Sequence, residues 1–182
     1  QLINLLAGIP SVIFGLFGMT TIVPFLRDYV SPNGVGYGIL AASLVLAVMI
    51  LPTVVSVSLD SLSAVPKSYY EGALALGATK EEAVFGIVLP AAKNGITAGI
   101  VLATGRALGE TMAVMLVIGG SPEMPGSLFQ SVRTLTANIA MGAMELKDDA
   151  LSALIASGVV LFVFALLLNI SFSALRCGKK KG

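Results

Sequence analysis

The sequence predicts an all-α integral membrane protein with about four transmembrane helices. Hydrophobic residues make up 56% of its 182 residues and charged residues only 12%. A soluble domain must cover its surface with polar and charged side chains, and this composition does not supply enough of them. A membrane-spanning helix needs roughly 20 mostly apolar residues to cross a hydrocarbon core about 30 Å thick. Four stretches of the sequence meet that requirement.

The composition also excludes several classes of chemistry. The sequence contains no histidine and no Gly-x-x-x-x-Gly-Lys-Ser/Thr loop. The commonest general base is therefore missing, which argues against an intramembrane enzyme, and we expect neither a P-loop ATP site nor a cofactor in this chain. A net charge of +1 gives no indication of nucleic-acid binding. Because the chain opens at Gln1 close to apolar sequence, we expect further spans to precede it.

Polar stretches separate the four predicted spans. The predicted spans lie at residues 9–26, 37–59, 95–119 and 151–175. Pro52 lies inside the second span and is expected to bend it. The 60–94 segment is too polar to lie in lipid, and the 120–150 segment is predicted to be an extracytoplasmic loop. Within that loop the apolar spacing over 128–139 favours a short interfacial helix. A basic tail, 176–182, follows the last span.

Lysine and arginine residues predict the orientation of the chain. The tail holds four of them and the 60–94 segment three, whereas the loops on the opposite side hold Arg27, Arg133 and Lys147. Positive residues concentrate in cytoplasmic loops. With four spans, the tail and the 60–94 segment fall on the same side of the membrane, and we expect both in the cytoplasm.

The 60–94 segment is predicted to form a helix-turn-helix. Pro66 suits the start of a first helix that runs to residue 76, and Gly77 supplies the left-handed residue that commonly ends a helix. Thr79 and Glu82 have the spacing of a capping box, in which each side chain bonds to the backbone N–H of the other. A second short helix is therefore expected to begin near Lys80.

This segment carries a motif that resembles the EAA signature of binding-protein-dependent ABC permeases. The signature reads Glu-Ala-Ala, three residues, Gly, nine residues, Ile-x-Leu-Pro, and Gly72 replaces its first alanine. The positions that match in register are Glu71, Ala73, Gly77, Ile87, Leu89 and Pro90. The resemblance implies an ABC importer type I permease (MetI-like) fold. It also implies that these residues and Gly72 form a coupling loop, whose first helix docks in a groove of a separate ATP-binding cassette ATPase subunit.

Arg106 and Glu110 place two charges inside the predicted third span, where a charged side chain costs about 2.5–3.5 kcal/mol. On an unbroken helix a spacing of four residues puts them on one face, where they can pair. Two interpretations stay open from the residues alone. Arg106 offers its planar donors to an oxyanion, held by Glu110 and assisted by the Thr111 hydroxyl. Alternatively, the two charges form a buried ion pair that only fixes helix packing.

The segment around these charges, residues 105–114, resembles the phosphate permeases and is closer to their PstC-type subunit than to the PstA-type partner. Residues 132–140 and 7–12 resemble the same subunit, so the whole chain, 1–182, is interpreted as an ABC transmembrane permease domain. The resemblance implies that Arg106 and Glu110 lie on a phosphate path. It further implies a partner permease, an extracytoplasmic phosphate-binding protein, an ATPase subunit and a bacterial or archaeal inner membrane. Sulfate or molybdate would suit the arginine equally, and a passive anion channel is a third alternative.

Small residues recur at every fourth position of the third span. Gly95, Gly99, Ala103 and Ala107 form one such series, and such faces let helix backbones approach closely. We expect a packing surface here, against the partner permease or simply as part of a Gly- and Ala-rich helix. Arg133, in the 120–150 loop, is interpreted as an anchor near the headgroups or as a residue that admits anions.

Overall fold

The computed structural model describes residues 8–144 and 148–178. Within those residues, four helical runs are long and apolar enough to cross a membrane, which agrees with the sequence prediction. They are Ser11–Val30, Ile39–Ser63, Lys80–Leu108 and Leu151–Phe172. Of the sequence features discussed above, Ala7, Lys147 and the three lysines of the basic tail lie outside the described residues.

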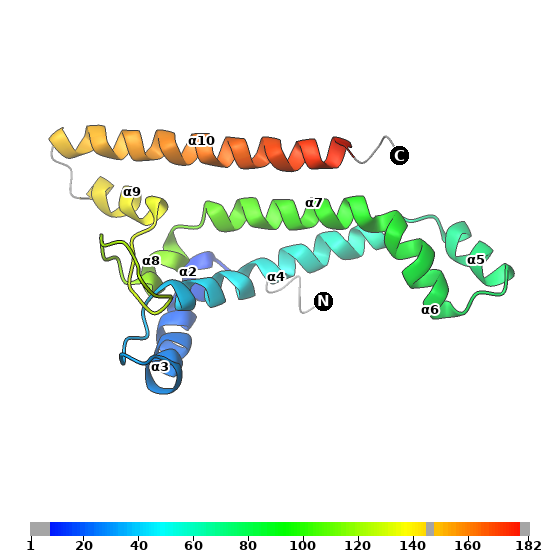
Figure 1. Cartoon of the computed structure of the whole chain (residues 1–182), viewed down its shortest axis with the longest axis horizontal. Coiled ribbons are helices and arrows are strands. Elements are labelled where there is room, and N and C mark those ends of the chain that lie inside the picture. Colours follow the sequence, from blue (N-terminus) through cyan, green and yellow to red (C-terminus); the bar gives the residue numbers. More distant parts are fainter. Residues whose placement is uncertain (1–7, 145–147, 179–182) are drawn as a thin grey trace.

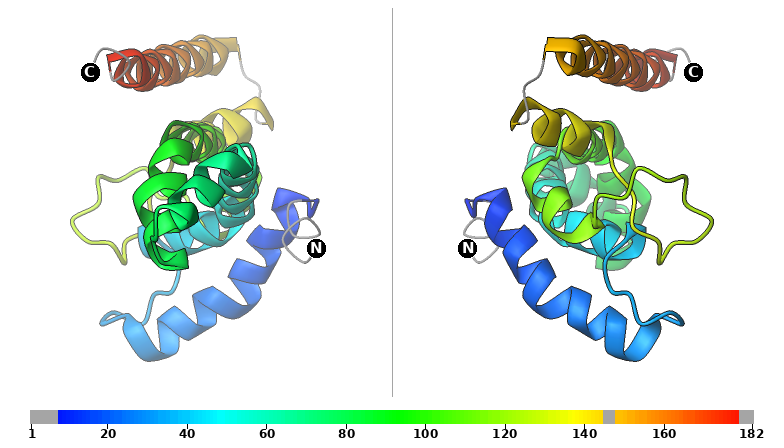
Figure 2. Two further views of the ribbon diagram at one scale, coloured as in Figure 1. Left: turned by 90° about the vertical axis from the view of Figure 1, so that its right-hand side faces the viewer. Right: turned by 90° about the vertical axis from the view of Figure 1, so that its left-hand side faces the viewer.

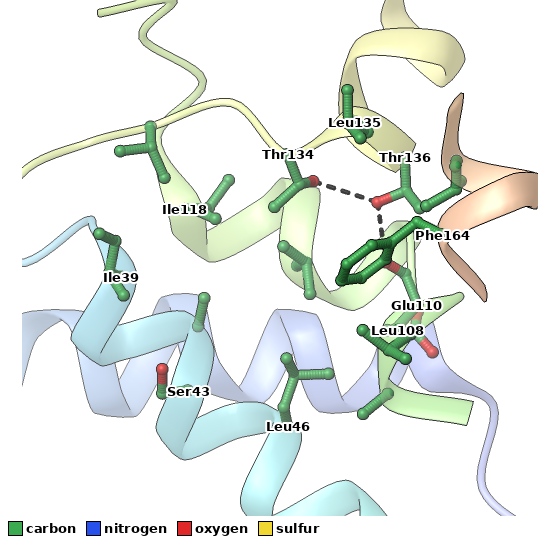
Figure 3. Close-up of a pocket in the computed structure, with 15 residues that line it drawn as sticks. Ile39, Ser43, Leu46, Leu108, Glu110, Ile118, Thr134, Leu135, Thr136 and Phe164 are labelled. Carbon is green, nitrogen blue, oxygen red and sulfur yellow. Dashed lines mark hydrogen bonds between the residues drawn. The ribbon is translucent and has the colours of Figure 1, made fainter. Parts of the chain in front are cut away.

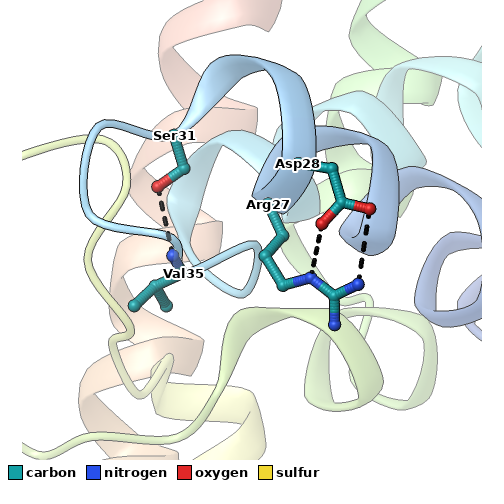
Figure 4. Close-up of polar contacts among 4 residues, drawn as sticks. All are labelled: Arg27, Asp28, Ser31 and Val35. Carbon is teal, nitrogen blue, oxygen red and sulfur yellow. Dashed lines mark hydrogen bonds and ion pairs between the residues drawn. The ribbon is translucent and has the colours of Figure 1, made fainter.

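The first run is one helix that alternates between α-helical and π-helical segments. It consists of α2 (Ser11–Phe17), the π-helical segment η1 (Gly18–Ile22), α3 (Val23–Phe25) and the π-helical segment η2 (Leu26–Val30). It extends four residues beyond the predicted end at Leu26, because the wide last turn pairs the Ser31 N–H with the Leu26 carbonyl at 2.7 Å. The charged residues of that turn bond to each other, with Arg27 Nε 2.8 Å from Asp28 Oδ1. In the link that follows, the Ser31 hydroxyl accepts the Val35 N–H (Figure 4).

The second run is the single helix α4 (Ile39–Ser63), with Pro52 inside it. Its first half forms the core together with α2 and with α8 (Met112–Ile118). Val45 of α4 and Val117 of α8 are 2% and 0% exposed. The side chain of Val45 also lies against Gly18, where the missing Cβ lets the first run approach closely. The helix continues through Asp60, four residues past the predicted end, into the turn that precedes the hairpin.

A helical hairpin follows, and its second arm is the beginning of the third span. The elements are α5 (Lys67–Ala75), α6 (Lys80–Ala83), the π-helical segment η3 (Val84–Val88) and α7 (Leu89–Leu108). The second helix, predicted to begin near Lys80, continues into the third predicted span, because residues 80–108 form one helical run. Pro90 lies in the first turn of α7, just after the π-helical segment, where a missing N–H is tolerated. The run bends there, and α6 turns away from the axis of α7 (Figure 1).

The last two described helices are α9 (Leu135–Met144) and α10 (Asp148–Gly178). The interfacial helix predicted over 128–139 is wrong in its first seven residues, because Val132 pairs with Gly119 in an isolated parallel bridge that holds the backbone extended. Helix α10 lies alongside α9 and α7, apart from the remaining helices (Figure 2). None of residues 151–172 is buried. Such an apolar surface requires lipid or another polypeptide to cover it.

Candidate functional site

The helical hairpin has the local structure that the sequence predicts. The Thr79 hydroxyl accepts the Glu82 N–H at 3.3 Å, and the Glu82 carboxylate accepts the Thr79 N–H at 2.8 Å, which completes the capping box. Gly77 adopts a φ of +91°, a left-handed conformation that few other residues take without strain. The two arms pack through small side chains, since Ala73 is 4% and Ala83 0% exposed. Ala73 of the predicted docking motif is therefore an internal packing residue.

The remaining motif residues lie on the outside of the hairpin. Glu71 and Gly72 are exposed on α5, and Ile87, Leu89 and Pro90 are exposed along the second arm. Three large apolar side chains that the sequence analysis did not single out are also exposed. They are Leu76 at 91%, Phe85 at 68% and Tyr69 at 53%. A folded, polar hairpin that presents apolar side chains has the character of a surface for another protein. The only sequence signal for these three was their apolar type within a polar segment.

The small residues of α7 pack against α4 of the same chain. A Cβ at Gly95 would collide with the Ser61 side chain, and one at Gly99 would lie 3.0 Å from Val57. Ala103 is 1% exposed. The small-residue series is therefore a packing surface inside this chain, against α4. Gly105 lies on a different face, because no atom of the described chain lies within 4 Å of a Cβ built there.

The same contacts give the position of Arg106 along the length of α4. Gly95 lies opposite Ser61 and Gly99 opposite Val57, so the two helices are antiparallel in a constant register. Continuing that register places Arg106 level with Ile50, near the middle of α4. Arg106 is exposed in the last turn of α7, on a face that also carries Leu102, which is 60% exposed. The charge thus lies level with the middle of α4, on a face that this part of the chain leaves uncovered.

The third span is interrupted immediately after Arg106. Helix α7 ends at Leu108, and α8 begins at Met112. The prediction of an unbroken span over 95–119 is therefore wrong, and so is the pairing of Arg106 with Glu110 that it would allow. Among the described residues the ion pair that the structure contains is Arg27–Asp28. A helix that ran unbroken from 80 to 119 would be about 60 Å long at the usual rise of 1.5 Å per residue, twice the thickness of the hydrocarbon core.

Glu110 and Thr111 organise the break. The Glu110 carboxylate accepts the Ala113 N–H at 3.1 Å, and it therefore caps the first turn of α8. The Thr111 hydroxyl donates to the Gly109 carbonyl at 3.3 Å. Each charge thus lies at the helix end that suits it, with the cation in the last turn of α7 and the anion at the start of α8. Two adjoining helix ends leave backbone groups that can bind a polar ligand.

A pocket of about 400 Å³ lies next to the break, between the end of α7 and helices α4, α8, α9 and α10. Its walls are mostly apolar and include Leu46, Leu108 and Phe164; the polar residues Glu110, Thr134 and Thr136 lie on one side and Ser43 on the other (Figure 3). The Thr136 hydroxyl donates to the backbone carbonyl of Glu110 at 3.1 Å. Arg106 does not line this pocket, so the two charges of the predicted path face different spaces.

Comparison with known proteins assigns the family. Residues 1–177 match the family described as binding-protein-dependent transport system inner membrane component. The chain is 41% identical over 167 residues to the probable ABC transporter permease protein YqgH of Bacillus subtilis (strain 168), which covers 91% of this chain and 54% of that protein. It is 38% identical over 200 residues to the phosphate transport system permease protein PstC of Xylella fastidiosa (strain 9a5c), which covers 99% of this chain and 62% of the relative.

A third relative, the phosphate transport system permease protein PstC 2 of Mycobacterium tuberculosis (strain ATCC 25618 / H37Rv), is 39% identical over 202 residues, which cover 100% of this chain and 62% of that protein. The chain thus spans between about half and two thirds of the length of these relatives. No solved structure matches. The match across residues 1–177, together with the four apolar helical runs, makes this chain a member of the family of binding-protein-dependent transport system inner membrane components.

Proposed function

We propose that this chain is the transmembrane permease subunit of an ATP-driven importer for inorganic phosphate. The observation that carries the proposal is the similarity to proteins named phosphate transport system permease protein PstC, at 38–39% identity over nearly the whole chain. The chain performs no covalent chemistry in this proposal. A separate ATPase subunit hydrolyses ATP, a PstA-type partner permease completes the path, and an extracytoplasmic phosphate-binding protein delivers the substrate.

The hairpin of α5 and α6 is the proposed docking surface for the ATPase, and it lies in the cytoplasm. It projects from one end of the molecule, and the C-terminal end of α10 lies toward the same end (Figure 1). This agrees with the orientation predicted from the basic residues. The exposed Glu71 and the exposed Leu76 and Phe85 supply charged and apolar contacts for a groove.

Arg106, Glu110 and Thr111 are proposed to form the substrate path of this subunit. An arginine guanidinium matches the geometry of an oxyanion, and its position level with the middle of α4, on an uncovered face, would let phosphate reach it from the space between two permeases. Interrupted helices are typical of substrate sites in transporters, since irregular backbone inside a membrane is tolerated where it is buried in protein or lines a cavity. The break at Gly109–Thr111 is such an interruption.

The test of the proposed function is uptake of labelled phosphate into proteoliposomes that hold the assembled transporter. We expect uptake that requires ATP and the binding protein, and that unlabelled phosphate blocks but sulfate and molybdate do not. Uptake without ATP would indicate a passive anion channel and would reject the importer. ATP-driven uptake of sulfate or molybdate in place of phosphate would reject the substrate.

The docking surface is tested by reversing one charge. Glu71→Lys is expected to weaken association with the ATPase at least tenfold and to abolish uptake, while membrane insertion stays intact. The matched control is Glu81→Lys, because Glu81 is also an exposed glutamate of the hairpin but lies on the other arm and outside the motif. Normal ATPase association and uptake in Glu71→Lys would show that the hairpin is not the dock.

The path is tested at Arg106. Arg106→Ala is expected to abolish uptake in a complex that still assembles, and Arg106→Lys is expected to restore only part of it, because lysine lacks the planar pair of donors. Loss of assembly in both variants would instead assign Arg106 to packing between subunits.

A further inference from the structure

The loop between α8 and α9 holds α8 at its C-terminal end. The Val132 N–H donates to the Ile118 carbonyl at 3.3 Å, and the Val132 carbonyl accepts the Gly120 N–H at 3.0 Å. The next residue, Arg133, donates from Nε to the Gly120 carbonyl at 3.0 Å. The end of this loop is therefore fastened to the end of α8 by three hydrogen bonds. The Arg133 side chain thus binds the backbone of its own loop.

Three residues after Arg133, Thr136 holds α8 at its N-terminal end. Thr136 lies in the first turn of α9 and is the buried polar residue of the described chain, at 9% exposure. Its hydroxyl donates to the Glu110 carbonyl across 26 positions in the sequence. Glu110 lies in the link between α7 and α8, so a side chain from a distant segment supplies this carbonyl with a partner. Residues 132–136 thus run alongside α8 and contact both of its ends.

The hydroxyl groups form a directed relay. The Thr134 hydroxyl accepts the Ala137 N–H at 3.2 Å, and it lies 3.1 Å from the Thr136 hydroxyl. Thr136 uses its single proton for the Glu110 carbonyl, so Thr134 must donate to Thr136 (Figure 3). Each of the two hydroxyl groups therefore donates one hydrogen bond and accepts one. Such a chain polarises its members and ties the cap of α9 to the break in the third span.

We propose that Thr136 is a positioning residue of the transport site, and that its hydroxyl fixes the break in the third span to the outer loop. The proposal rests on the proposed function, since it assigns the loop to the side that the binding protein approaches. A displacement of residues 132–136 then moves both ends of α8, and with them Glu110 and the last turn of α7. The loop thereby gains a direct mechanical connection to the substrate path.

Two substitutions of Thr136 separate the effect of its hydroxyl from the effect of its size. Thr136→Val preserves the shape but removes the donor, and leaves the partly buried Glu110 carbonyl without its partner. Thr136→Ser keeps the donor and loses one methyl group. The matched control is Thr97→Val, because the exposed Thr97 hydroxyl donates only to the Lys93 carbonyl of its own helix, at 2.8 Å.

The experiment uses the assembled transporter in proteoliposomes and measures two quantities for each variant. One is amide hydrogen exchange of a peptide covering residues 109–118, with a peptide from α4 as the internal reference. The other is ATP-driven uptake as a function of binding-protein concentration. For Thr136→Val we expect at least fivefold faster exchange over 109–118, at least tenfold lower maximal uptake and a half-saturating binding-protein concentration within twofold of wild type. Thr136→Ser and Thr97→Val are expected to behave as wild type.

Unchanged exchange in Thr136→Val, or uptake within twofold of wild type despite faster exchange, would overturn the proposal. Equal losses in Thr136→Ser and Thr136→Val would also overturn it, because volume rather than the hydroxyl would then matter. If Thr136→Val does not assemble, Thr134→Ala removes the donor to Thr136 while sparing the bond to Glu110, and it must speed exchange at least twofold. A wild-type transporter that takes up no phosphate would reject the proposed function alone, since the exchange difference between the Val and Ser variants tests the link separately.

Discussion

Replacing Glu110 by alanine or by glutamine separates its two roles, as a helix cap and as a charge on the path. The Glu110 carboxylate accepts the Ala113 N–H at 3.1 Å, and Ala113 is fully buried, so water cannot replace the carboxylate easily. Loss of a capping side chain costs about 0.5–2 kcal/mol. Loss of a negative charge at a helix N-terminus costs about 0.3–1 kcal/mol.

Glu110→Ala loses both contributions, and Glu110→Gln loses only the second because its amide oxygen still accepts the bond. The first turn of α8 is therefore expected to lose about 1–3 kcal/mol in the alanine variant and at most about 1 kcal/mol in the glutamine variant. At a factor of ten for each 1.4 kcal/mol, exchange of the α8 amides rises about fivefold to a hundredfold in Glu110→Ala and at most about fivefold in Glu110→Gln.

The assay is hydrogen exchange of residues 109–118 in the reconstituted transporter, with phosphate uptake measured on the same preparations. If the carboxylate charge also serves the path, Glu110→Gln lowers uptake strongly while α8 stays nearly as protected as in wild type. Equal exchange in the two variants would refute the assignment of Glu110 as the cap. Normal uptake in Glu110→Gln would restrict the residue to its structural role.

Two further substitutions test the packing. Gly72→Ala is expected to slow exchange over residues 67–76 by up to about fivefold, because a Cβ there meets no atom within 4 Å and alanine stabilises a helix interior by up to about 1 kcal/mol relative to glycine; faster exchange would contradict the exposed placement of Gly72. Gly99→Leu is expected to destabilise the pairing of α4 and α7 by about 1–3 kcal/mol, since its Cβ would lie 3.0 Å from Val57. Thermal unfolding of the purified protein measures this loss, with Gly105→Leu as the control on the open face; equal losses at both positions would show that the contact with Val57 does not matter.

Local sequence was sufficient for the hairpin. The capping box of Thr79 and Glu82 and the left-handed Gly77 are interactions between near neighbours, and the structure contains both. Local sequence did not show, however, that the second helix, predicted to begin near Lys80, continues into the third span as one helical run over residues 80–108. Polarity limits what lies in lipid, but it does not end a helix, so the helix simply extends beyond the apolar segment.

The sequence by itself determined the four apolar runs, the hairpin and the family, since each depends on composition or on residues close together in the chain. Only the tertiary structure decided that the third span breaks at Gly109–Thr111. Apolar residues dominate on both sides of the break, and one of the bonds that stabilise it comes from a distant segment, the hydroxyl of Thr136, 26 positions from Glu110. The hydropathy of residues 95–119 therefore predicts one span, whereas the hydrogen bonds at the break divide it into two helices. That difference separates Arg106 from Glu110 and gives each charge a helix end of its own.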